Sequence, residues 1–431
     1  MANDMTRVPG EASDTAGPGG EGWTSRQLWV VLLISIAVVM DGLDNRLLPL
    51  AIPPLLKQWG ASRDDFALAT SVGLIGMALG TVAGGMVGDR IGHRPTILGS
   101  VILFGVVTLI NAFVTDVTQL IVVRFAAGLG LGALMPASAA MIAAFAPPRH
   151  RATAVILGMT CIPIGGTLSG LLGAALLPTP GWRALFLVGG VVAIGIGVLQ
   201  WFALPESPDF LARKKAPARS VQRTAANDDD SSAGLFARGY ARDTLGLWVA
   251  FFAILLCLYM ESQWMPTILA GRGYGPKVAS IASSCLAFGG IFACVIGVAA
   301  VSRFGSRVAL MGMAAAGVVL TLGLTQYAAD PSRSAAPLLV LLTIAGFLIG
   351  GLQIMIYSVA SHVYPGALRA TGIGWAVGMG RLGSVISPFV ATEAMALGGW
   401  VPFFTALAAG LAVTCVSLGV IRRHVPPNRP A

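Results

Sequence analysis

Long uninterrupted apolar runs constrain the fold of this chain more than any other feature of its sequence. Examples are Leu28–Met40, Val101–Ile110 and Val188–Val198, each flanked by further apolar residues. Runs of about 20 apolar residues have the length of a helix that crosses the hydrocarbon core of a bilayer. Only 11% of the residues are charged, whereas soluble domains carry roughly 25%. A soluble enzyme, a secreted disulfide scaffold and a disordered regulator are therefore excluded.

The glycine and cysteine content agrees with helices packed in lipid. The chain has 55 glycines, and small residues let membrane helices approach closely. The alternating segments of about 10 residues that mark a membrane β-barrel are absent. The five cysteines lie inside apolar blocks without disulfide or metal spacing, so we interpret them as packing residues. We expect no metal site and no cofactor.

The apolar pattern predicts an all-α membrane protein with twelve transmembrane helices. The expected helices cover residues 28–50, 66–88, 96–114, 118–145, 152–177, 183–204, 244–270, 278–301, 307–327, 336–361, 370–394 and 401–421. Residues 1–25 are polar, lack the features of a cleavable signal peptide and predict a disordered cytoplasmic tail. The expected domains are an N-terminal six-helix bundle (26–204), a cytoplasmic linker (205–243), a C-terminal six-helix bundle (244–422) and a tail (423–431).

Basic residues are distributed unevenly between the two sides of these helices. Lys and Arg concentrate in the tails, in the linker and in the loops after even-numbered helices, for example at Arg90, Arg149 and Arg303. The loops on the other side hold fewer, for example Lys57 and Lys277. Because cytoplasmic loops are enriched in Lys and Arg, both termini are expected in the cytoplasm. The net charge of +9 is thus no indication of nucleic-acid binding.

The two halves of the chain resemble each other at a nearly constant offset. Pro147–Thr153 matches residues 365–371, and Gly181-Trp182 matches Gly399-Trp400, both at an offset of 218 residues. Residues 89–94 match residues 302–307 at an offset of 213. Six helices separate each matched pair, so the halves share one orientation. Two parallel six-helix repeats predict two bundles around a central site.

Two motifs resemble those of the major facilitator superfamily. The segment Gly85–Arg94 resembles the signature loop between the second and third helices, with His93 where a basic residue is usual. Pro205-Glu206-Ser207-Pro208 resembles the motif that closes the sixth helix. The resemblance implies the fold of that superfamily.

Within the superfamily, three regions resemble the aromatic acid:proton symporter family. They are Asp41-Gly42-Leu43-Asp44 in the first helix, Arg124 to Pro136 in the fourth, and Tyr364 to Gly383 in the tenth and eleventh. The resemblance implies import of a small aromatic carboxylate, of the benzoate or hydroxybenzoate type, by proton symport with alternating access. It also implies a monomer in the bacterial cytoplasmic (inner) membrane, driven by the proton gradient.

Asp41 and Asp44 are the candidate proton-coupling pair. Ionisable residues at membrane depth are costly and mark transport pathways. Residues three apart share one helix face, and two neighbouring carboxylates in a low dielectric disfavour double ionisation. The alternative is that one Asp only pairs with an Arg to hold the bundle together. In the family that this sequence resembles, the motif is implicated in transport.

Five further residues are the candidate substrate-binding groups. Arg124 and Arg381 offer planar forks that match a carboxylate, although a structural ion pair with a helix 1 carboxylate is an alternative. Glu261 stands where a neutral residue is expected in the family, so it could bind a substrate hydroxyl, share proton coupling or sit at the outer mouth of its helix. Gln353 and Tyr357 are four apart and share a face that could hydrogen-bond a ligand.

Other charged residues have roles that the sequence leaves open. Arg46 departs from the family pattern and could snorkel outward, pair with Asp44 or contact substrate. His362 is a candidate proton relay, with a structural role at a helix end as the alternative. Asp89, Arg90 and Arg94 are expected to form a gating network at the cytoplasmic surface.

Competing functions remain at this stage. A proton-coupled antiporter that exports drugs or metabolites usually has Gly-Pro before paired Gly in the fifth helix, whereas this chain has Ile162-Pro163-Ile164-Gly165-Gly166. A symporter of another organic acid and a non-transporting sensor also fit the fold. A membrane enzyme lacks support, because no metal-ligand cluster or paired nucleophile and base lies in the expected helices.

Overall fold

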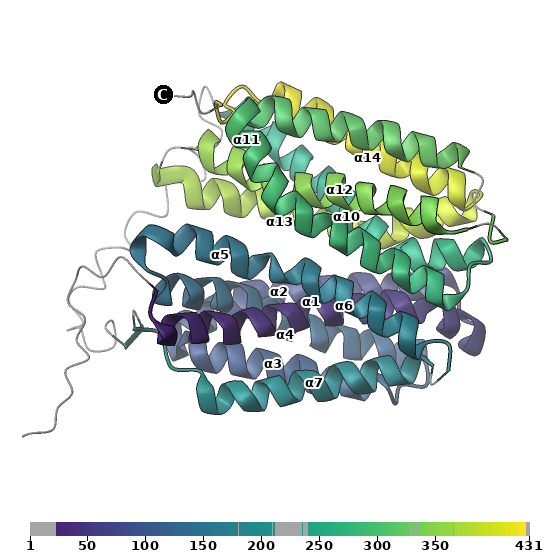
Figure 1. Cartoon of the computed structure of the whole chain (residues 1–431), viewed down its shortest axis with the longest axis horizontal. Helices are drawn as coiled ribbons and strands as arrows, with labels where there is room; N and C mark the ends of the chain where they lie inside the picture. The colour runs from purple at the N-terminus through teal and green to yellow at the C-terminus, as the bar shows by residue number, and fades with distance from the viewer. Residues whose placement is uncertain are drawn as a thin grey trace, which may run out of the picture.

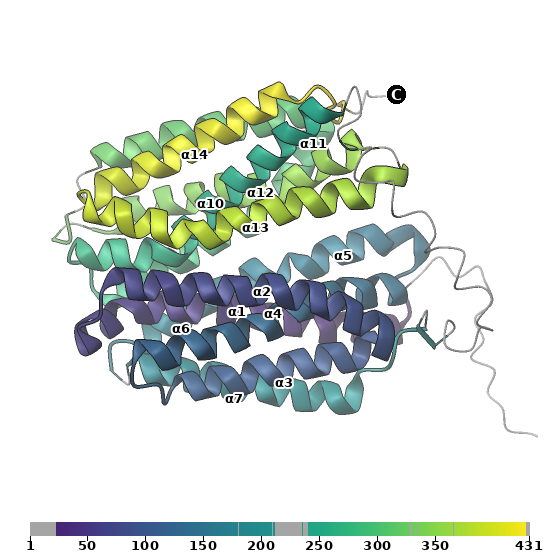
Figure 2. The same cartoon turned by 180° about the vertical axis from the view of Figure 1, so that it is seen from behind.

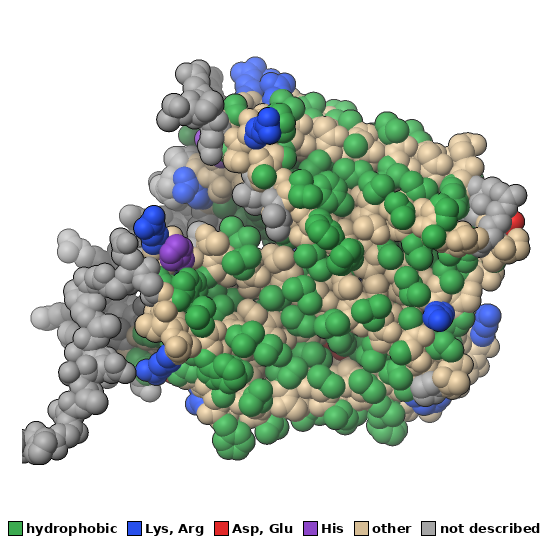
Figure 3. All heavy atoms as spheres, viewed as in Figure 1, with side chains coloured by type: hydrophobic (Ala, Val, Ile, Leu, Met, Phe, Trp, Pro, Cys, Tyr) green, Lys and Arg blue, Asp and Glu red, His purple; other side chains and the backbone are tan. Residues whose placement is uncertain are grey.

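The computed structural model describes residues 23–179, 181–208, 210–211, 235, 240–327, 330–332, 334–364 and 366–427. Within these residues, twelve helices are long and apolar enough to cross a membrane, which confirms the predicted number. Residues 1–22 of the predicted N-terminal tail, residues 428–431 of the predicted C-terminal tail and most of the predicted linker lie outside the described residues. Apolar side chains cover much of the face shown in Figure 3, and Lys and Arg gather at its two ends.

The N-terminal half contains six membrane-crossing segments. Its helices are α1 (Ser25–Trp59), α2 (Arg63–Ile91), α3 (His93–Asn111), α4 (Val117–Phe145), the short 3-10 helix η1 (Pro148–His150), α5 (Arg151–Met159), α6 (Cys161–Leu176) and α7 (Trp182–Ala203). The fifth predicted helix is interrupted between α5 and α6, although both parts belong to one span. Pro163, which cannot donate a backbone hydrogen bond to the preceding turn, accounts for the break.

The C-terminal half repeats this arrangement. Its helices are α10 (Ala241–Gly271), α11 (Pro276–Gln326), α12 (Ala336–Val363), α13 (Gly366–Ala396) and α14 (Trp400–Val420). α11 contains two spans, which meet near Gly305. The halves lie one above the other in Figure 1 and are seen from behind in Figure 2. Contacts between them run through the pairs α6–α11, α2–α13 and α1–α10.

Equivalent glycines and tryptophans bear out the internal repeat. Gly92 and Gly305, 213 residues apart, both turn the chain between two spans with positive φ angles, 109° and 78°, which glycine adopts without steric cost. Trp182 and Trp400, 218 residues apart, each begin a helix. Their indole N–H groups donate to Gln58 Oε1 and to the carbonyl of Leu324, both at 2.7 Å.

Glycines allow the closest helix pairs to form in both halves. A Cβ added at Gly132 of α4 would lie 2.8 Å from the backbone nitrogen of Thr81 in α2. In the other half, a Cβ at Gly289 of α11 would lie 2.7 Å from the backbone nitrogen of Phe347 in α12. Such contacts exclude larger side chains and hold these helix pairs at a fixed crossing, as is typical of packing in lipid.

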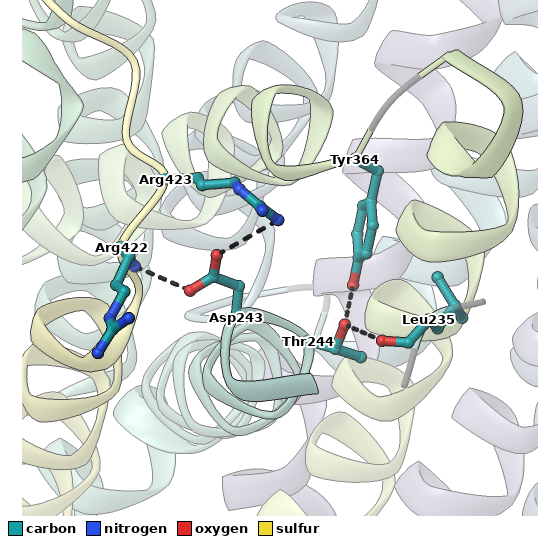
Figure 4. Close-up of polar contacts among 6 residues, drawn as sticks. All are labelled: Leu235, Asp243, Thr244, Tyr364, Arg422 and Arg423. Atoms are coloured by element: carbon teal, nitrogen blue, oxygen red, sulfur yellow. Dashed lines mark hydrogen bonds and ion pairs between the residues drawn. The ribbon is translucent and has the colours of Figure 1, made fainter. Parts of the chain in front are cut away.

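We call the end of the bundle where α1 begins the basic end, and the other the opposite end. The basic end carries the exposed or half-buried residues Arg90, Arg94, Arg303, Arg307 and Arg422. There, Arg422 and Arg423 of the segment that follows α14 lie beside Asp243 at the start of α10 (Figure 4). The backbone N–H of Arg422 donates to Asp243 Oδ1 at 2.8 Å, and Arg423 Nη1 lies 3.9 Å from Asp243 Oδ2. Asp243 thereby fixes this segment to the start of α10.

Two further sets of hydrogen bonds order the same end. Tyr364 donates to Thr244 Oγ1 at 3.1 Å, and Thr244 donates to the carbonyl of Leu235 at 3.0 Å (Figure 4). On α11, the Ser306 hydroxyl accepts from the backbone N–H of Val425 at 2.9 Å. His424 Nδ1 lies 3.2 Å from that hydroxyl and its Nε2 lies 3.0 Å from the carbonyl of Leu418.

Candidate functional site

A cavity of about 440 Å³ lies between the two halves. Its wall is built from α1, α4, α5 and α6 on one side and from α10, α11 and α12 on the other. This volume is within the range of small-molecule sites. Most of its wall is apolar, and its polar side chains include Asn45, Arg46, Thr160, Tyr259, Glu261, Ser262, Gln353 and Tyr357. The cavity therefore combines aromatic and apolar surface with a few charged groups.

Arg46 on α1 and Glu261 on α10 lie on opposite halves, and both line this wall. Arg46 Nη1 donates to the carbonyl of Ser262 at 3.2 Å, and Glu261 is the carboxylate whose charge acts on Arg46. Glu261 is only 3% exposed. Of the three interpretations open for Arg46, snorkelling outward is wrong: the guanidinium points into the protein because its partners lie on α10.

Asp41 and Asp44 are buried in α1, at 4% and 2% exposure, outside the cavity wall. The hydroxyl of Thr108 in α3 donates a hydrogen bond to Asp44 Oδ1. The charge of Arg124 acts on Asp44, and that of Arg381 acts on Asp41. One oxygen of each carboxylate, Asp41 Oδ1 and Asp44 Oδ2, is buried without a hydrogen-bond partner. The structure thus assigns a different arginine to each carboxylate of the sequence motif.

Arg124 does not line the main cavity. It lies in a separate small cavity of about 30 Å³ between α1, α2, α4 and α10, which also includes Asn45 and Gln263. Its guanidinium carbon lies 5.5 Å from the ring centre of Phe186, and its Nε and Nη2 have no hydrogen-bond partner. Because it is enclosed beside Asp44, this position favours the structural alternative over direct contact with a substrate in the main cavity.

Arg381, Gln353 and Tyr357 are close to the main cavity, as the sequence predicts for substrate-binding groups. Arg381 Nη1 lies 3.3 Å from the hydroxyl of Tyr259, a residue of the cavity wall. Gln353 and Tyr357 both line the wall. The ring of Tyr357 packs edge-on against Phe251 at 5.1 Å, which fixes its orientation. Arg381 therefore reaches the cavity through Tyr259.

The remaining predicted residues lie away from the cavity. His362 is exposed near the end of α12 at the basic end, and Asp89 and Arg90 are exposed at the end of α2. The backbone N–H of Arg94 donates to Glu206 Oε1 at 3.1 Å, and its Nη2 donates to the carbonyl of Trp201 at 2.6 Å. These contacts of Arg94 join α3 to the end of α7, within one half.

Sequence reasoning missed several polar residues of the site. Asn45 lines both cavities and accepts a hydrogen bond from Gln263 Nε2 at 3.3 Å, which joins α1 to α10. Tyr259 connects Arg381 to the cavity, and Thr108 binds Asp44. Asn45 and Gln263 are polar residues in apolar helices, close in sequence to the predicted residues Asp44 and Glu261. This position could have indicated them as site residues. Thr108 gave none, because threonine is common in membrane helices, where its hydroxyl can bond its own backbone.

Hydrogen bonds between the halves, in the described part of the chain, lie at mid-depth and toward the opposite end. The Ser284 hydroxyl in α11 donates to the carbonyl of Thr167 in α6 at 2.8 Å. The Ser71 hydroxyl in α2 donates to the carbonyl of Val385 in α13 at 2.8 Å. The cavity wall, in contrast, extends along α5 toward the basic end. The two halves are therefore closed at the opposite end, and the cavity faces the basic end.

Comparison with known proteins identifies the family. The family model described as Major Facilitator Superfamily matches residues 34–388. The chain belongs to the major facilitator superfamily. It is 31% identical to a gallate transporter of Pseudomonas putida, over 89% of this chain and 91% of that protein. It is 32% identical to a 3-(3-hydroxy-phenyl)propionate transporter of Escherichia coli, over 92% of this chain and 94% of that protein.

These relatives place the chain among the aromatic acid transporters of the superfamily, as the sequence motifs predict. A third, the 4-hydroxybenzoate transporter PcaK of Pseudomonas aeruginosa, is 30% identical over 92% of this chain and 93% of its own length.

Among solved structures, a D-xylose-proton symporter covers 94% of this chain with a TM-score of 0.73 at 18% identity, and 99% of that chain is covered. An inward-facing bacterial homologue of the lysosomal transporter Spinster gives a TM-score of 0.70 at 17% identity, over 93% of this chain and 95% of its own. The structural matches confirm the fold of this multi-pass membrane protein.

Proposed function

We propose that this protein is a secondary active transporter that imports a small aromatic carboxylate, of the benzoate or hydroxybenzoate type, by proton symport with alternating access. The observation that carries the proposal is the cavity between the halves, where Arg46 lies in an otherwise largely apolar and aromatic wall. An aromatic carboxylate needs these two surfaces, a cation for its carboxylate and an apolar slot for its ring. The relatives named as transporters of aromatic acids support the same ligand class.

Proton coupling is assigned to Asp41 and Asp44. Both carboxylates are buried, the charge of one arginine of another helix acts on each, and each keeps one oxygen without a hydrogen-bond partner. A buried carboxylate in this setting exchanges its proton when its arginine partner moves, because the neighbouring charge is what stabilises the ionised form. Arg124 belongs to α4 in the same half as the two carboxylates, whereas Arg381 belongs to α13 in the other half. Rocking of the halves would therefore alter the Asp41–Arg381 interaction most. No cofactor takes part, and the proton gradient supplies the energy.

The orientation follows from the charges at the two ends. Arginine-rich loops face the cytoplasm, so the basic end and both termini are assigned to the cytoplasm of a bacterial cell, with the protein a monomer in the inner membrane. The cavity then faces the cytoplasm, the state in which an importer releases its substrate. Asp89, Arg90 and Arg94 are assigned to gating at this end, where helix ends separate and rejoin.

Uptake of a panel of labelled benzoates by cells that express the protein tests this proposal. We expect accumulation of at least one ring acid, loss of that accumulation with a protonophore, and loss with Asp44→Asn. The matched control is Asp64→Asn, which changes an exposed carboxylate at the start of α2. Uptake that is indifferent to the protonophore and to Asp44 would contradict proton symport, and a proton flux opposite to the substrate would favour the antiporter.

A further inference from the structure

We infer that Glu261 takes up a proton when the substrate binds, because the substrate's carboxylate replaces Glu261 as the partner of Arg46. The inference rests on the proposed function, and it adds a carboxylate to the site that is separate from Asp41 and Asp44. It starts from the position of Arg46 and Glu261, which lie on opposite halves and both line the cavity.

Arg46 is the arginine of the main cavity wall, among the residues that the structure describes there. Arg124 is enclosed in another cavity, and the Nη1 of Arg381 is held by Tyr259 and by Met77 Sδ at 3.3 and 3.4 Å. One N–H of Arg46 is bound to the carbonyl of Ser262. Arg46 and Glu261 both line the cavity, and the charge of each acts on the other. A substrate carboxylate in the cavity therefore competes with Glu261 for the positive charge of Arg46.

One arginine cannot balance two ionised carboxylates in a buried site. A second uncompensated charge in a low dielectric costs several kcal/mol, and a carboxylic acid avoids this cost by becoming protonated. The substrate arrives as an anion, so the proton goes to Glu261 from water that enters the cavity. One O–H bond forms on Glu261, the net charge of the Arg46, Glu261 and substrate group stays at zero, and neutral Glu261 can donate a hydrogen bond to the bound anion.

Among the groups around Glu261, Arg46 is the cation that takes part in this exchange. Arg46 on α1 is the charged side chain that acts on Glu261 most directly. Tyr259 on α10, Tyr357 on α12 and Cys294 on α11 also line the cavity, and Arg381 on α13 reaches it through Tyr259. Cys257 is buried on α10 outside the cavity wall. None of these thiols and phenols brings a second fixed positive charge next to Glu261.

The exchange also links substrate binding to the contacts between the two halves. Arg46 is joined to α10 through Ser262, and its neighbour Asn45 is joined to Gln263. Like the contacts that close the opposite end, these two bonds join one half to the other. A substrate that draws the Arg46 guanidinium toward itself therefore weakens one of the links between the halves at the moment when Glu261 becomes neutral.

Isothermal titration calorimetry on the purified protein tests the inference, with 4-hydroxybenzoate and benzoate as probes. Titrations in buffers of different ionisation enthalpy count the protons taken up on binding. In the wild type, over the pH range in which Glu261 is ionised without substrate, uptake of one proton makes the affinity fall about tenfold for each unit by which the pH rises. Glu261→Gln should still bind the probe, with proton uptake reduced by about one per substrate and a correspondingly flatter pH dependence.

Two further variants keep the result unambiguous. Glu261→Asp should restore most of the proton uptake, which a purely structural role of Glu261 would not require. Glu393→Gln, which changes an exposed carboxylate of α13, should bind like the wild type. Binding with unchanged proton uptake in Glu261→Gln would overturn the inference alone. A wild-type protein that binds no aromatic carboxylate would overturn the proposed function as well.

Discussion

A single methyl group at Gly170 should separate the two halves at the opposite end, where the structure shows them closed. We call the α6–α11 contact at this end the opposite-end gate. Gly170 lies on α6, where it packs against α11 of the other half. A Cβ at this position would collide with the Ser284 hydroxyl and the Ser280 carbonyl, and would lie 2.7 Å from the backbone nitrogen of Ser284. Overpacking of this kind costs about 1–3 kcal/mol. Because the two helices belong to different halves, the protein can relieve the collision by separating them, without unfolding either bundle.

This cost predicts a population shift that can be measured. A change of about 1–3 kcal/mol moves a two-state equilibrium roughly 5- to 150-fold, away from the state closed at the opposite end. Spin labels at Lys57→Cys and Lys277→Cys, exposed on α1 and α11 at that end, would report the separation in a background without the native cysteines. Gly170→Ala should shift the distance distribution to longer values.

The control for this variant is Gly312→Ala in α11, the helix against which Gly170 packs. An added Cβ at Gly312 meets nothing within 4 Å. It should leave the distances unchanged. An unaltered distribution in Gly170→Ala, with the protein still folded, would refute the assignment of the α6–α11 contact as a gate.

Three further predictions concern stability and the basic end. Thr108→Val leaves Asp44 without the hydroxyl that binds it and should cost about 1–3 kcal/mol, seen as a lower midpoint of thermal unfolding in detergent. Gly92→Ala places a Cβ 2.5 Å from Glu206 Oε2 at a φ of 109° and should destabilise the α2–α3 turn by about 1–3 kcal/mol, in the same assay. Burial lowers the pKa of His424 from its usual 6.5, so the released tail binds more protons than the docked one below that pH. The segment that follows α14 should therefore dock more weakly as pH falls from 7.5 to 5.5, which faster amide exchange at Val425 would show. His424→Gln should flatten this pH dependence.

The fold could be predicted from the sequence because it depends on repeating, local features. Apolar runs of spanning length give the helices, and the 213-residue offset between Gly92 and Gly305 gives the repeat. The two differences in the helices both have local causes. Pro163 divides the fifth span, and Gly305, with φ 78° and ψ 158°, breaks the helical conformation inside α11 where two spans meet.

The site was predictable only in part, because the sequence does not say which helix faces meet. Glu261, Gln353 and Tyr357 do line the main cavity. Arg124 was grouped with them, but close packing of α2 on α4 encloses it in a cavity of its own. Arg46 could not be placed without knowing that α10 lies across from it, since its orientation depends on a partner 216 residues away.

The most direct test of the account is to count protons and substrate together in liposomes that contain the purified protein. An inward proton gradient should drive accumulation of an aromatic carboxylate. A substrate gradient directed into the liposomes, without a proton gradient, should acidify the lumen with at least one proton per anion. Asp44→Asn should abolish gradient-driven accumulation, while Asp64→Asn should keep it. Accumulation without proton movement, or proton movement opposite to the substrate, would contradict symport through the helix 1 carboxylates.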